Sequence, residues 1–224
     1  MSALAIAAAV LLCPVQEETY ALRWAPTQGQ KTSYLYQFEF ADPKAAMKMS
    51  ATMESAIQSV GKDGYITKTV SKNAVITLAG QEIRDERANP VVAQFGKRGE
   101  ILKIVEGKTD AGAYEIGRFN KFVAPENAVK VGESWEYTYP AIERTAPSHK
   151  VSFKLIEVKQ GPIAKMAKVT CEIGDASGKG VFKGTGTWMV NATTGEPETF
   201  EGAAEGVNGQ PEMKFKLKMS RTAR

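Results

Sequence analysis

The chain has 224 residues, of which 43% are hydrophobic and 24% charged, as in an ordinary globular protein. Its 29 basic and 25 acidic side chains are spread along the chain and leave a formal charge of +4, too small an excess to predict nucleic-acid binding. A chain of this length buries roughly 70% of its unfolded surface, enough for one large core.

The chain begins with a leader-like segment. Residues 3–12 are an unbroken run of small and aliphatic side chains, too short to cross a bilayer as a helix. We therefore predict a cleaved signal peptide at 1–16 and a secreted or periplasmic protein, although no basic residue precedes the run. Leu12 stands where a bacterial lipoprotein signal needs a small residue, so we do not expect a lipid anchor on Cys13.

Cys171 is the only cysteine that remains once the leader is removed, so no disulfide within the chain is expected. It alternates with Val169 and Ile173, which predicts a small buried side chain rather than a reactive thiol.

Period-two alternation predicts two strands at the start of the mature chain. Residues 19–24 place Tyr20, Leu22 and Trp24 on one side. After a turn at 26–29, residues 32–40 carry aromatic side chains at every second position, namely Tyr34, Tyr36, Phe38 and Phe40.

Residues 42–61 fit two structures. Asp42-Pro43 is a good helix start and Gly61 a good helix end. The same segment also alternates as a strand, and the turn sequence at 61–64 leads into a Thr-, Val- and Ile-rich segment at 65–78. These neighbours favour a hairpin, so we predict a strand and keep the helix as the alternative.

The next segments predict a hairpin and a helix. Residues 91–95 and 101–105 flank the turn Gly96-Lys97-Arg98-Gly99. Residues 110–122 then fit a short helix capped by Asp110, with apolar side chains at threefold spacing.

Residues 129–140 show the strongest pattern, because Val131, Trp135, Tyr137 and Tyr139 share one side of an extended backbone that ends at Pro140. Further strands are predicted at 149–158, 163–173, 181–190, 198–206 and 213–219. In the last of these, Lys214, Lys216 and Lys218 are typical of an exposed edge strand.

Turn glycines recur in the two halves of the chain. The pairs are separated by 103, 97 and 96 residues: Gly29 and Gly132, Gly64 and Gly161, Gly99 and Gly195. We therefore predict one β-rich domain over residues 17–224, built from two pseudo-repeats at about 17–124 and 125–224. Two such meanders would bury their apolar sides in a strongly curved antiparallel sheet or incomplete barrel, with a two-sheet sandwich as the alternative.

Signs of catalytic chemistry are weak. Gly132-Glu133-Ser134-Trp135 matches half of a nucleophile elbow, and the lone histidine, His149, is expected in a solvated loop. The glycine-rich loop at 174–180 has the wrong spacing for a phosphate loop, and one histidine with one cysteine cannot form a zinc site alone. We expect no catalytic residue, metal or cofactor.

Aromatic and methionine side chains on the strands are the candidate ligand-lining residues, because methionine adapts to irregular apolar shapes. Simple core packing is the alternative. The candidates are Tyr36, Phe38, Met47, Met49, Met53, Trp135, Tyr137 and Trp188.

The segment Val129–Trp135, with Pro125 before it and Tyr137 after it, resembles a V-x-V-G-[DE]-S-W signature of uncharacterised secreted bacterial β-sheet proteins. Residues 181–195, with Trp188, resemble a second motif of these proteins. A curved sheet with an apolar concave side is also distantly similar to periplasmic lipoprotein carriers. The resemblance implies no activity.

We therefore expect an exported, non-catalytic β-protein that binds an apolar ligand, lipid or lipidated partner. A structural or protein-interaction module of the cell envelope with a packed core is the alternative, and an enzyme comes third. We expect neither a nucleic-acid partner nor a transmembrane span.

Overall fold

The computed structural model describes residues 18–41, 46–85, 90–143 and 145–222. The predicted signal peptide, with Cys13, lies outside these residues.

Strands dominate the described residues, with one α-helix and one short 3₁₀ turn among them. In chain order the elements are β1 Lys31–Ala41, β2 Met47–Gly61, β3 Gly64–Leu78, β4 Gln81–Asp85, β5 Val91–Phe95, β6 Ile101–Glu106, α1 Ala111–Phe119, β7 Ser134–Tyr139, β8 His149–Gln160, β9 Lys165–Asp175, β10 Lys183–Asn191, β11 Pro197–Glu205, η1 Val207–Gly209 and β12 Lys214–Arg221.

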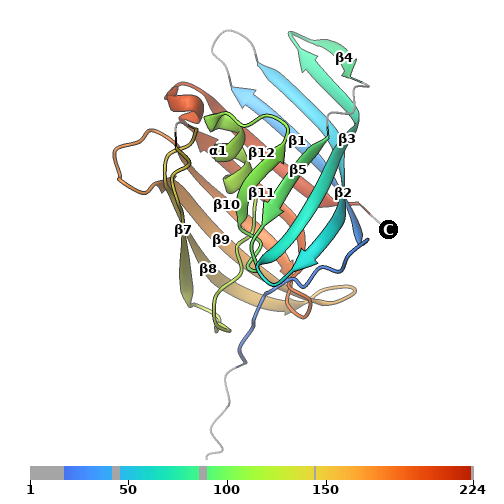
Figure 1. The fold of residues 1–224 in the computed structure, drawn as a ribbon, viewed down its shortest axis with the longest axis vertical. Helices are drawn as coiled ribbons and strands as arrows, with labels where there is room; N and C mark the ends of the chain where they lie inside the picture. The colour runs from blue at the N-terminus through green and yellow to red at the C-terminus, as the bar shows by residue number, and fades with distance from the viewer. Residues whose placement is uncertain (1–17, 42–45, 86–89, 144, 223–224) are drawn as a thin grey trace, which may run out of the picture.

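The described strands form one antiparallel sheet in the order β6-β5-β3-β2-β1-β12-β11-β10-β9-β8-β7, with β4 paired to β3 outside this path. The sheet curls into a nearly closed barrel (Figure 1), with an open seam where β6 and β7 end the path. The predicted curved all-β fold is confirmed, in its single-sheet form rather than as a sandwich. The duplication of the chain stays a prediction.

Alternation builds the barrel wall, as β12 illustrates. Phe215, Leu217 and Met219 are buried, while the lysines between them face solvent. The predicted edge position is wrong, because β12 pairs with β1 on one side and β11 on the other. The lysines instead cover the outer face, where Lys214 contacts Glu205 at 3.0 Å and other ion pairs join neighbouring strands.

The ambiguous segment at 42–61 is a strand. β2 begins at Met47 and pairs with both β1 and β3, so the hairpin prediction is confirmed. Residues 42–45 lie outside the described residues.

Two predicted strands are wrong in extent. Within residues 19–24 only an isolated bridge from Tyr20 to Val129 forms, because Leu22 turns the backbone with φ +46°. The strand predicted at 129–140 begins at Ser134, since Gly132 adopts φ +92° in a turn. Val131 is consequently 51% exposed instead of joining the buried side.

The predicted helix is confirmed as α1. The Oδ1 atom of Asp110 accepts a hydrogen bond from the Ala113 N–H at 2.9 Å, which caps its N-terminus. At its other end, Phe119 packs edge-on against Phe200 and Phe215 of the sheet, at ring-centroid distances of 5.1 and 5.7 Å. Because these two rings lie on the buried side of β11 and β12, α1 lies inside the barrel.

The interior is filled unevenly. Phe122, which follows α1, packs against Trp135, Phe153 and Trp188 from the C-terminal strands. The helix and this segment therefore occupy the side of the barrel formed by β7–β12. The concave side of β1–β6 is left with a cavity.

Candidate functional site: an apolar cavity in the barrel

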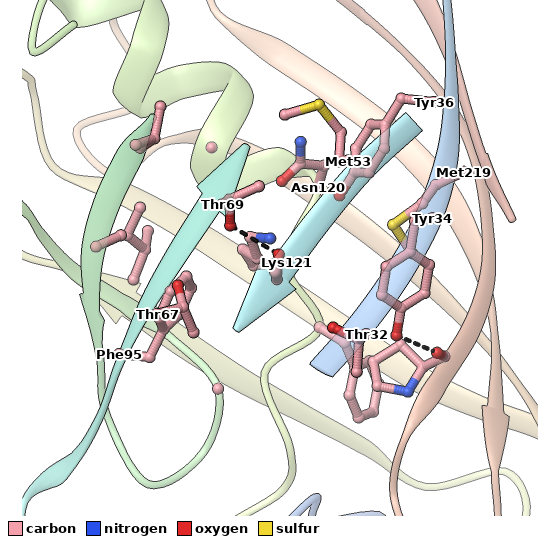
Figure 2. Close-up of a pocket in the computed structure, with 18 of the residues that line it drawn as sticks. Thr32, Tyr34, Tyr36, Met53, Thr67, Thr69, Phe95, Asn120, Lys121 and Met219 are labelled. Atoms are coloured by element: carbon pink, nitrogen blue, oxygen red, sulfur yellow. Dashed lines mark hydrogen bonds between the residues drawn. The ribbon is translucent and has the colours of Figure 1, made fainter. Parts of the chain in front are cut away.

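The cavity has a volume of about 500 Å³, within the range of about 300–1,000 Å³ of small-molecule sites. Most of its wall comes from the inner faces of β1, β2, β3, β5 and β6 and from α1 with the residues after it. Leu22 and Trp24 of the N-terminal segment and single residues of β10, β11 and β12 complete it. Figure 2 shows part of this lining.

Five of the eight predicted ligand-lining residues line this one cavity: Tyr36, Phe38, Met49, Met53 and Trp188. They come from β1, β2 and β10, so the barrel brings together side chains that are distant in sequence. The alternation in 32–40 and 47–57 predicts these positions because it points the same side chains to the concave face.

The other three candidates lie elsewhere. Met47 borders a separate space of about 670 Å³ that is rimmed by charged side chains. Trp135 packs under Phe122 and donates its Nε1–H to the Val123 carbonyl oxygen at 2.8 Å. Tyr137 is half-buried beneath the guanidinium of Arg98, whose Cζ atom lies 5.4 Å from the ring centroid.

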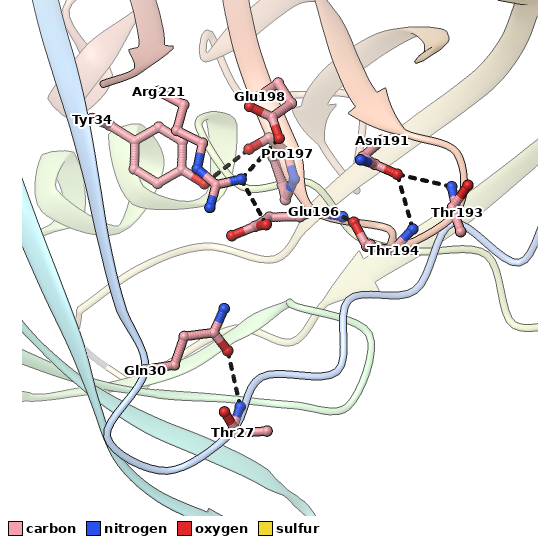
Figure 3. A network of polar contacts seen from close by, with 10 residues as sticks. All are labelled: Thr27, Gln30, Tyr34, Asn191, Thr193, Thr194, Glu196, Pro197, Glu198 and Arg221. Carbon is pink, nitrogen blue, oxygen red and sulfur yellow. Dashed lines mark hydrogen bonds and ion pairs between the residues drawn. The ribbon is translucent and has the colours of Figure 1, made fainter. Parts of the chain in front are cut away.

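A network of polar contacts lies next to the cavity residues Tyr34 and Pro197 (Figure 3). The Tyr34 hydroxyl donates to the Pro197 carbonyl oxygen at 2.8 Å, and both residues line the cavity. Beside them, Nη1 of Arg221 contacts the carboxylates of Glu196 at 2.6 Å and Glu198 at 2.8 Å. These contacts tie the β10–β11 hairpin to β1 and β12.

The N-terminal segment, residues 22–24, packs against the β10–β11 hairpin. Gly195 has φ +71°, and a Cβ atom there would collide with the backbone of Arg23 and Trp24. The glycine therefore lets the chain pass close to the hairpin. Trp24 then meets Tyr65 edge-on at 5.7 Å, so the segment contributes an aromatic wall.

Hydroxyl groups interrupt the apolar wall on β2 and β3. Ser55 Oγ and Thr69 Oγ1 lie 2.7 Å apart and satisfy each other, and Thr67 is buried nearby on β3. The lining is therefore mainly apolar, with hydroxyl groups at points along β2 and β3 and at Thr32 of β1.

Lys121 places an ammonium group in the cavity lining. It follows α1 and the C-cap residue Asn120, is half-buried, and its Nζ atom lies 5.4 Å from the centroid of the Phe95 ring. Burial away from water lowers the pKa of its ammonium to about 8. Figure 2 shows the side chains of Lys121 and Asn120 beside the strands that carry Met53 and Thr69.

A second polar cluster lies beyond α1. Arg118 is 2% exposed and donates to the carbonyl oxygens of Pro147 at 2.6 Å and Pro140 at 2.9 Å. Its Nη1 atom also lies 2.7 Å from Nδ1 of His149. The prediction of a solvated loop for His149 is therefore wrong: the residue begins β8 and is 0% exposed.

The half-elbow at Ser134 does not meet this histidine. In the β7–β8 pair, Ser134 lies opposite Lys154, whereas His149 lies opposite Tyr139 at the other end of β7. Five residues of extended strand separate the two positions, a span of roughly 17 Å. The structure therefore does not bring Ser134 and His149 together.

Cys171 lies in β9 with its side chain buried, as predicted. Burial raises the pKa of its thiol to about 12, which keeps it protonated and unreactive at neutral pH. Over the described ranges, no three His, Cys, Asp or Glu side chains gather as a metal site would require. No helix in the same part of the chain combines the length and apolarity needed to cross a membrane.

Sequence reasoning missed Lys121 and Asn120 as site residues. The available signal was a lysine between two aromatic positions, in Phe119-Asn120-Lys121-Phe122, directly after a predicted amphipathic helix. Only the fold shows that Asn120 and Lys121 line the same cavity as the aromatic side chains of β1.

No protein-family model matches the chain, and no curated protein matches its sequence. Among solved structures, the chain is similar to the hypothetical lipoprotein YmcC from Escherichia coli K12, with 10% sequence identity and a TM-score of 0.36. The match covers 86% of this chain and 85% of that one. This distant likeness concerns the course of the chain and carries no further conclusion.

Proposed function

We propose that this is an exported, non-catalytic β-protein that holds an apolar ligand, either a lipid or the acyl chain of a lipidated partner, inside its curved sheet. The observation that carries the proposal is the cavity of about 500 Å³ lined by Tyr36, Phe38, Met49, Met53 and Trp188. An apolar ligand in a cavity lined by large apolar side chains would gain dispersion contacts with them.

A packed envelope module is the second candidate. The close aromatic packing of Phe119 and Phe122 against the C-terminal strands favours it. That packing involves one side of the barrel only. The two candidates therefore differ in whether the side formed by β1–β6 is occupied in the native protein.

Native mass spectrometry of the protein purified from its own host tests the proposal. We expect lipid-sized adducts on the wild-type protein. Ala51→Phe should reduce them, because Ala51 is 3% exposed, lines the cavity, and a larger ring there would fill the space. Ala176→Phe is the matched control, since Ala176 lies in an exposed loop away from the cavity.

Circular dichroism would first establish that each variant is folded. Adducts lost in Ala51→Phe and kept in Ala176→Phe would support the proposal. A wild-type protein that carries no adduct, or adducts that persist at wild-type level in folded Ala51→Phe, would contradict it.

A further inference from the structure

The charged side chains in the cavity lining are of one sign. Its lining includes Arg98, Lys108 and Lys121, and no aspartate or glutamate among the described residues. An apolar cavity surrounded in this way favours an anion over a cation or a zwitterion.

Two of the three cations already have partners. The Nε atom of Arg98 donates to the Ala124 carbonyl oxygen at 2.7 Å, and its guanidinium covers the Tyr137 ring. Lys108 is mostly exposed and pairs with Asp110 at 2.7 Å. Neither group needs a ligand to satisfy it.

Lys121 differs from both. Over the described part of the chain, its ammonium has no hydrogen-bond or ion-pair partner, and its contact is with the Phe95 ring. An ammonium that is partly shielded from water retains its charge at lower cost when an anion pairs with it. No carboxylate of the described residues pairs with Lys121.

Asn120 provides a second, independent indication of a ligand site. The residue is 9% exposed and lines the same cavity, and its Oδ1 atom is buried without a partner among the described residues. Its backbone N–H already caps α1 by donating to the Ile116 carbonyl oxygen, so the side-chain amide is not needed for the cap. An amide can turn about χ2 to offer its NH₂ group in place of its oxygen.

We propose that the cavity binds a fatty acid, with the carboxylate paired to Lys121 and hydrogen-bonded to the Asn120 amide, and the alkyl chain along Phe38, Met49 and Met53. The proposal rests on the apolar-ligand function above and names the chemical class of that ligand. It commits to a single-chain carboxylic acid because, among the described residues, Lys121 is the one lining cation without a partner, and most of the other lining side chains are apolar or carry hydroxyl groups.

The contact between the carboxylate and Lys121 determines how strongly the cavity should prefer a fatty acid to an alcohol of the same chain length. A hydrogen bond to a charged group is stronger than a neutral one, and leaving a buried charge unpaired is costly. We therefore expect sodium dodecanoate to bind about 10- to 100-fold more tightly than 1-dodecanol at pH 7. The two probes share the same alkyl chain, so the apolar walls contribute equally to both.

The experiment titrates delipidated full-length mature protein with each probe below its aggregation concentration, by calorimetry and by tryptophan fluorescence. Trp24 and Trp188 line the cavity and report its occupancy. Lys121→Met keeps the apolar stem and removes the charge. Lys103→Met is the matched control, because Lys103 is an exposed residue of β6 outside the cavity lining.

In Lys121→Met, we expect dodecanoate affinity to fall at least to that of dodecanol, because the carboxylate loses its counter-ion, while dodecanol affinity is unchanged. Lys103→Met should behave as the wild type. Equal wild-type affinities for the two probes, or a preference for dodecanoate that survives Lys121→Met, would overturn the carboxylate inference and leave the apolar-ligand function standing. Binding of neither probe would overturn both. If Lys121→Met does not fold, the wild-type comparison of the two probes alone decides.

Discussion

The guanidinium of Arg118 contacts the imidazole of His149, with Nη1 and Nδ1 2.7 Å apart in the buried interior. Because arginine can only donate, Nδ1 must accept, which fixes a neutral imidazole that carries its proton on Nε2. Loss of hydration and then the nearby guanidinium lower the pKa of His149 to about 4, while Asp175 opposes the shift. This contact anchors α1 to the start of β8.

The first prediction concerns stability at low pH. In the unfolded chain His149 takes up a proton near pH 6.5, whereas in the folded protein it does so near pH 4. The unfolded state therefore binds more protons in this window, and stability falls as pH drops from 6.5 to 4, by about 3 kcal/mol at most from this group.

Urea unfolding of the wild type and His149→Gln between pH 4 and 7 measures this effect. We expect a shallower loss of stability for the variant, because glutamine does not titrate. Parallel stability–pH curves for the two proteins would contradict the assigned neutral histidine.

The second prediction concerns Trp135, which is 9% exposed, stacks on Phe153 at 5.4 Å, and donates to the Val123 carbonyl oxygen. Trp135→Ala should lower the free energy of unfolding by about 3–5 kcal/mol, because it leaves a large void and an unpaired carbonyl group. Val131→Ala, at a 51% exposed position, should change it by less than about 0.5 kcal/mol. Equal melting temperatures for the two variants would show that Trp135 does not hold β7 in place.

The third prediction concerns the approach of α1 to the sheet. A Cβ atom on Gly202 would lie 2.7 Å from Phe119 Cζ, 2.6 Å from Phe200 Cζ and 2.8 Å from the Thr185 backbone oxygen. Gly202→Ala should therefore destabilise the protein by about 1–3 kcal/mol and speed hydrogen exchange of the α1 amides.

Gly61→Ala is the control for this substitution, because a Cβ atom there meets nothing within 4 Å. It should leave exchange in α1 unchanged. Slow α1 exchange in Gly202→Ala, equal to that of the control, would mean that the helix does not depend on this close contact.

The fourth prediction follows from the pKa of Lys121, which burial lowers to about 8. A bound carboxylate raises that pKa, so binding takes up a proton above pH 8. The affinity for dodecanoate should fall by up to tenfold per pH unit from pH 8 upward, whereas the affinity for dodecanol should stay constant.

Other lining groups do not mask this titration. Burial raises the pKa values of Tyr34, Tyr36 and Tyr65 above the range tested. Calorimetric titrations from pH 7 to 9.5 would show the decrease. A dodecanoate affinity that is flat or rises over this range would contradict the role of Lys121.

Much of the fold is readable from the sequence because most strands bury one face only. Phe215, Leu217 and Met219 alternate with lysines, and a period of two leaves one register that hides the apolar set. The start of β7 and the path of residues 19–24 were mispredicted, because the positive φ angles at Gly132 and Leu22 depend on how distant segments meet. The alternation of side chains along one strand does not predict how that strand packs against distant segments.

The candidate site was predictable in part for the same reason. Alternation placed Tyr36, Phe38, Met49 and Met53 on the concave face, where the structure has them. The position of Lys121 was not predictable, because its isolation from carboxylates depends on which side chains β3, β5 and α1 bring around it. Sequence spacing gives the neighbours of a residue along the chain, not those across a barrel.

The most direct test is a crystal structure of the wild-type protein with 12-bromododecanoic acid, in which anomalous scattering from bromine locates the end of the alkyl chain. We expect the chain inside the barrel beside Met53 and Phe38, with a carboxylate oxygen about 2.7–2.9 Å from Nζ of Lys121. An empty cavity, or a ligand bound only on the outer surface of the sheet, would contradict the account.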